Sequence, residues 1–126
     1  MSRPVPVWLV AVTATALALA VWVLAVPVGG VDLSAGAPPQ QVGAVSVVVM
    51  TVVVTLAAWG ARTLLRRRTP VVWWLTCGIV LAISLLGPLG GTSPAAVGTL
   101  VVLHLVVGAT VATGLDPRRA RGVTTR

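Results

Sequence analysis

One histidine, His104, is the side chain best placed for chemistry in this chain, because it stands alone within a long apolar run. An imidazole can relay protons or bind a metal ion or haem. Such roles need partners, and the other reactive side chains, Cys77, Asp32 and Asp116, stand in different segments. A lone histidine makes a poor metal site, because zinc sites use three or four protein ligands. We therefore expect no catalytic residue, no metal and no cofactor, and we interpret His104 as a neutral structural residue hydrogen-bonded to a hydroxyl on a neighbouring helix.

Hydroxyl side chains inside the apolar runs are the candidate partners of His104. They are Thr13, Thr15, Ser46, Thr51, Thr55 and Ser84. Thr51 and Thr55 are four residues apart, so they lie on one face of a helix. Either hydroxyl can instead donate to a carbonyl of its own helix. The candidate polar or functional residues inside the membrane are therefore His104, Thr51, Thr55 and Ser84.

Small residues follow His104 at helical spacing. Gly108 and Ala112 come one and two turns after it and share its face of the helix. Small residues allow two helices to approach closely within a membrane. Gly43 and Gly98, which stand near the starts of their apolar runs, are predicted to do the same near the outer surface. We therefore predict a helix-packing role for all four residues.

Four apolar runs are the elements that must position these side chains. The 126 residues are 57% hydrophobic and 9% charged, whereas soluble domains carry about 25% charged residues. Lipid must therefore surround most of the chain. The runs cover about residues 7–28, 42–65, 71–87 and 94–113, and they predict a single all-α domain, residues 1–126, built as a bundle of four transmembrane helices. His104 lies about ten residues into the last run, or roughly 15 Å deep, near the middle of the bilayer.

Arginines flank the apolar runs and determine the predicted orientation. Most of them gather between the second and third runs and in the tail, at Arg62, Arg66, Arg67, Arg68, Arg118, Arg119 and Arg121. Cytoplasmic loops are rich in such residues. We therefore predict that both termini, the loop 66–70 and the tail 114–126 are cytoplasmic, and that the loops 29–41 and 88–93 lie outside. The net charge of +7 then implies anionic lipid headgroups as partners at the inner face, at about 1 kcal/mol per charge, and not nucleic acid.

Two alternatives concern the first run and the symmetry of the chain. The first run resembles a signal peptide followed by a small-residue cleavage site at Ala35–Ala37, but its apolar stretch exceeds the 7–15 residues or so that such peptides use. The first and third runs end in similar segments, Pro27–Gly30 and Pro88–Gly91. Such similarity is expected of a parallel repeat of two helical hairpins, or of chance resemblance between helices rich in valine and alanine.

Three segments resemble those of a known family. They are Gln40–Gly43, Ser84–Gly91 and the run from His104 to Leu115. The chain resembles, over roughly residues 5–115, a group of small four-helix membrane proteins of high-GC Gram-positive bacteria that is catalogued as a domain of unknown function. The resemblance implies four helices and no assigned activity, so it transfers no functional residue.

Three classes of function are compatible with these features. The first is a non-enzymatic membrane protein that forms homo-oligomers or joins a larger membrane complex, because the chain has few ionisable groups and little mass outside the membrane. The second is a small oligomeric transporter or channel for a hydrophobic or small solute, with His104 in the pathway. Small multidrug exporters need a glutamate in their first helix, and this chain has none. The third is a membrane enzyme or cofactor carrier, in which only His104 could serve as the reactive or ligating residue.

Overall fold

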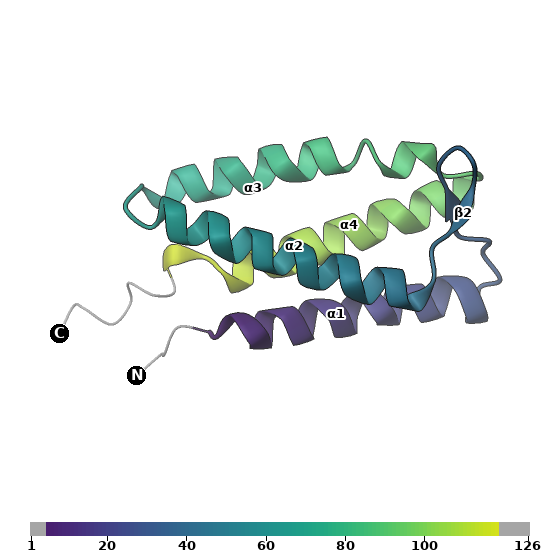
Figure 1. Cartoon of the computed structure of the whole chain (residues 1–126), viewed down its shortest axis with the longest axis horizontal. Helices are drawn as coiled ribbons and strands as arrows, with labels where there is room; N and C mark the ends of the chain where they lie inside the picture. The colour runs from purple at the N-terminus through teal and green to yellow at the C-terminus, as the bar shows by residue number, and fades with distance from the viewer. Residues whose placement is uncertain (1–4, 119–126) are drawn as a thin grey trace.

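Four helices form the body of the protein, which a computed structural model describes for residues 5–118 (Figure 1). They are α1 (Val7–Val23), α2 (Ala44–Leu65), α3 (Pro70–Ser84) and α4 (Pro94–Gly114). A π-helical turn, η1 (Leu24–Val28), extends α1, and a 3-10 turn, η2 (Pro88–Gly90), follows α3. All four segments are long and apolar enough to cross a membrane. The four-helix architecture expected from the sequence is thus confirmed.

Prolines and a serine determine where the last two helices begin. Pro70 and Pro94 occupy the first turns of α3 and α4, where the missing N–H has no helical partner in any case. Ser93 caps α4, because its Oγ accepts the Ala96 N–H at 3.1 Å. Thr69 stands at the same position before α3, but its side chain makes no capping hydrogen bond.

Two helix ends differ from the predicted bounds for local reasons. The second helix begins at Ala44 and not at Val42, because the Val42 N–H donates to the Leu33 carbonyl at 2.8 Å and so belongs to the preceding loop. The third helix ends at Ser84 and not at Gly87. A proline ring clashes with the carbonyl four residues before it, and for Pro88 that carbonyl belongs to Ser84.

The connection between α1 and α2 is an ordered cap and not a plain loop. Strands β1 (Ser34–Ala35) and β2 (Gln40–Gln41) form a small antiparallel hairpin. The α3–α4 connection joins it, because the Thr92 N–H donates to the Ser34 carbonyl and the Gly36 N–H donates to Gly90, both at 3.1 Å. Gly36 has a φ of +94°, which glycine adopts without steric cost. The two predicted outer loops therefore form one hydrogen-bonded unit at one end of the bundle.

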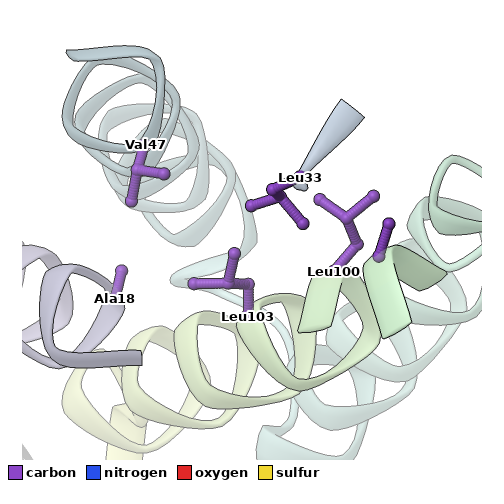
Figure 2. Packing of buried hydrophobic residues seen from close by; sticks show 6 residues of the cluster. Ala18, Leu33, Val47, Leu100 and Leu103 are labelled. Atoms are coloured by element: carbon purple, nitrogen blue, oxygen red, sulfur yellow. The ribbon is translucent and has the colours of Figure 1, made fainter. Parts of the chain in front are cut away.

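The buried side chains gather in two clusters, one towards each end of α1. Near the cap, Ala18, Val47 and Leu103 pack with Leu33 from the β1 side (Figure 2). Near the arginine-rich end, the second cluster comprises Val10, Ala14, Trp73, Val111 and Leu115. Ala14 and Ala18 are fully buried, since their small side chains let α1 lie close against its neighbours.

Helix α1 packs along both α2 and α4, whereas α3 lies at the edge of the bundle and touches mainly α4. Only 6% of the most apolar stretch of the α3 segment is buried, against 28% for α4. The α1–α2 hairpin is thus packed along its length and the α3–α4 hairpin is not. The internal repeat suggested by the sequence stays a prediction.

Candidate functional site

His104 lies half-buried in the middle of α4 and bonds within its own helix. Its Nδ1 lies 2.8 Å from the Leu100 carbonyl oxygen. A carbonyl can only accept, so Nδ1 carries a proton and donates it to this bond. We expected a hydroxyl of a neighbouring helix at the imidazole. The partner of Nδ1 is instead the backbone carbonyl one turn back.

Three of the candidate hydroxyls, those of Thr51, Thr55 and Ser84, also bond to their own helices. Thr51 Oγ1 donates to the Val47 carbonyl at 2.7 Å, Thr55 Oγ1 donates to Thr51 at 2.8 Å, and Ser84 Oγ donates to Leu81 at 2.8 Å. Thr51 and Thr55 are buried, at 3% and 0% exposure. These threonines follow the second alternative raised from their spacing, since a hydroxyl in an apolar helix is satisfied most simply by the carbonyl one turn back.

The register of α3 and α4 brings His104 to the level of Ser84. A Cβ atom at Gly108 would lie 2.9 Å from Leu81 Cδ1, which locates a close contact between the two helices. The helices run in opposite directions (Figure 1). Moving one turn back from Gly108 to His104 therefore corresponds to moving about one turn forward from Leu81 to Ser84. Both polar residues are half-buried on this loosely packed flank.

The predicted packing residues divide into two groups. Gly108 faces Leu81, and Ala112 is buried, with its carbonyl accepting the Trp73 Nε1–H at 3.2 Å. A Cβ at Gly43 or Gly98 would meet nothing within 4 Å in the described chain. These two glycines therefore make no close helix contact within one copy of the described chain, and their packing role stays a prediction.

No metal centre is formed within residues 5–118, where no three His, Cys, Asp or Glu side chains come together. Asp32 lies in the cap, and its Oδ1 accepts the Ser34 hydroxyl at 2.7 Å. Asp116, beyond α4, accepts the Arg118 N–H at 2.9 Å. Each of these two carboxylates thus serves a local turn.

The arginine-rich end contains a cavity of about 280 Å³ between α2, α3 and the segment after α4. Its lining includes Trp59, Arg62, Leu65, Arg66, Trp73 and Pro117. Arg67, Arg68 and Arg118 are exposed outside this lining. Arg119 and Arg121, also predicted to face lipid headgroups, lie outside the described residues. The described arginines at this end therefore form two groups: Arg62 and Arg66 line the cavity, and the other three are exposed outside it.

One family profile matches residues 1–121 of the chain. The chain belongs to DUF6069, a family of unknown function. No curated protein and no solved structure matches it. Membership in DUF6069 thus agrees with the expected family of unknown function and assigns no residue a role. The bacterial range suggested by the resemblance stays a prediction.

Sequence reasoning missed two features of this DUF6069 protein. Trp73 is 2% exposed and ties α3 to α4, although nothing in the residues around it distinguishes it from the exposed apolar residues of α3. The cavity was missed as well, although Trp59, Arg62 and Arg66 recur at intervals of three and four residues, which indicates one helix face. This spacing in the sequence could have indicated a shared face of α2. The opposite wall comes from α3, so the cavity could not be predicted from α2 alone.

Proposed function

We propose that this DUF6069 protein is a non-enzymatic membrane subunit that associates through its helices, first with further copies of itself and otherwise with a larger membrane complex. The observation that supports this most is the exposed side of α3 that no other helix of the described chain covers. Leu75, Ile79 and Ile83 stand there four residues apart and are 59–62% exposed. Side chains at this spacing form a ridge of the kind that packs into a groove of another helix.

The state of the polar side chains supports a non-enzymatic role. Most hydroxyls in the spans are committed to carbonyls of their own helices, as are those of Thr51, Thr55, Thr76 and Thr110. Catalysis by acid, base or nucleophile needs side chains within hydrogen-bond reach of one another. In this proposal the arginine-rich end faces the cytoplasm, because short cytoplasmic loops are enriched in arginine.

Association is tested by measuring the mass of the purified full chain in lipid nanodiscs and mild detergent. We expect a defined oligomer or a co-purifying subunit. The double variant I79A/I83A should weaken association, because it removes the ridge. V49A/V53A on α2 is the matched control, since those valines are also about half exposed. A strict monomer without other subunits would overturn the proposal, and so would equal loss in both double variants.

A second candidate is a small oligomeric transporter or channel for a hydrophobic or small solute. It is favoured by His104, which lies at mid-span on the flank towards α3 and bonds through Nδ1 to the Leu100 carbonyl, so that Nε2 is the ring nitrogen open to a solute. Ionisable residues at this depth often mark a transport pathway. We expect His104→Ala to abolish flux in proteoliposomes while the thermal unfolding midpoint is kept. Unchanged flux would remove this candidate.

A further inference from the structure

The cavity at the arginine-rich end has the chemistry of a phosphate site at a membrane surface. Arg62 and Arg66 are one helical turn apart and both line it. One guanidinium group can bind two oxygens of a phosphate through two parallel hydrogen bonds. Arg62 is half-buried and Arg66 exposed, so Arg62 is the more enclosed of the two lining arginines.

The charge in the pocket is not neutralised by the described chain. The protein has two acidic residues. Asp32 lies in the cap at the opposite end. Asp116 stands next to the lining residue Pro117 and accepts the backbone N–H of Arg118, so it supplies at most one negative charge against the two positive charges of Arg62 and Arg66. The C-terminal end of α2 favours positive side chains through its dipole, which accounts for arginines there but not for their convergence on a cavity. The pocket therefore carries net positive charge and suits an anion.

Apart from Thr63, whose hydroxyl donates to the Gly60 carbonyl at 2.7 Å, the remaining walls are apolar. Trp73 is 2% exposed, and its Nε1–H is already donated to the Ala112 carbonyl at 3.2 Å. Trp59, Leu65 and Pro117 complete the apolar lining, with Trp59 46% exposed. Indole rings favour the boundary between headgroups and acyl chains. A ligand with a phosphate at one end and an apolar part beside it fits these walls better than a free anion does.

We propose that this pocket binds the phosphate of one anionic phospholipid headgroup. Its volume of about 280 Å³ lies just below the roughly 300–1,000 Å³ of typical small-molecule sites, so it holds a headgroup and leaves the acyl chains against the helices. This differs from diffuse attraction of lipid to all the arginines, because Arg62 and Arg66 bind and Arg67 and Arg68 do not.

The test compares two double variants that remove the same charge from the same end. The full chain is placed in phosphatidylcholine nanodiscs, and phosphatidylglycerol is titrated while quenching of tryptophan fluorescence by a brominated form of that lipid is followed. Each pocket arginine should contribute about tenfold or more in affinity through its hydrogen bonds to the phosphate, so R62Q/R66Q should lose roughly 100-fold. The control R67Q/R68Q removes only diffuse attraction, about fivefold per charge at most, and should lose clearly less. The single variants R62Q and R66Q give the same reading at about tenfold each if the double variant unfolds.

Three other outcomes decide against part or all of the assignment. Equal losses in R62Q/R66Q and R67Q/R68Q would overturn the pocket and leave diffuse attraction. Quenching that does not saturate would overturn it too. Inorganic phosphate is added as a second arm: displacement of the brominated lipid at millimolar phosphate would assign the site to the free anion and overturn the lipid assignment. The experiment measures lipid affinity and not the mass of the assembly, so its outcome does not depend on whether the protein forms oligomers.

Discussion

Three glycines on α4 allow a prediction in which the same substitution has different outcomes. An alanine Cβ at Gly98 would meet nothing within 4 Å, and replacing glycine by alanine inside a helix stabilises by up to about 1 kcal/mol. At Gly114 the added Cβ would lie 2.9 Å from both methyl carbons of Val10. Val10 is 3% exposed, and its branched side chain has one favoured rotamer in a helix.

The magnitude follows from these contacts. Overpacking a tight contact costs roughly 1–3 kcal/mol, so Gly114→Ala should destabilise while Gly98→Ala stabilises. The two variants should differ by roughly 1–4 kcal/mol in free energy of unfolding. Gly108→Ala should fall between them, because its Cβ would meet the rotatable end of Leu81 at 2.9 Å. The assay is unfolding by titration with a denaturing detergent, followed by tryptophan fluorescence. A Gly114→Ala variant as stable as Gly98→Ala would refute the reasoning.

Two further predictions concern polar groups. Thr15 Oγ1 is buried without a partner among the described residues, so Thr15→Val should raise the unfolding midpoint by the equivalent of about 1 kcal/mol; Thr51→Val, which removes a bonded hydroxyl, is the matched control and should not stabilise. Trp73→Phe should lower the free energy of unfolding by about 1 kcal/mol or more, because it removes the hydrogen bond to Ala112. An unchanged unfolding midpoint would show that this bond does not hold α3 to α4.

The number of helices could be predicted because lipid imposes a simple rule. Each apolar run must satisfy its own backbone, so it becomes a helix wherever it is long enough. The loop 29–41 could not be foreseen as a cap, because its order depends on partners more than fifty residues away in the chain. The hydrogen bond from Thr92 to Ser34 is one of these.

The contacts of individual helix faces could be predicted only in part. The spacing of His104, Gly108 and Ala112 correctly indicated one face, and Gly108 does contact α3. At Gly98 the described chain forms no such contact, because no other helix lies in front of that part of α4. Composition identifies a small residue but does not show whether a second helix passes in front of it.

The orientation of the chain is the central claim, and labelling of single cysteines tests it most directly. Cys77 is the one cysteine, so Cys77→Ser supplies a background without reactive thiols, into which Gln40→Cys or Thr69→Cys is introduced at an exposed position. A membrane-impermeant maleimide applied to intact cells should label the thiol at position 40 and should reach that at position 69 only after permeabilisation. Labelling at 69 in intact cells, or protection at 40, would contradict four crossings with the arginine-rich end inside.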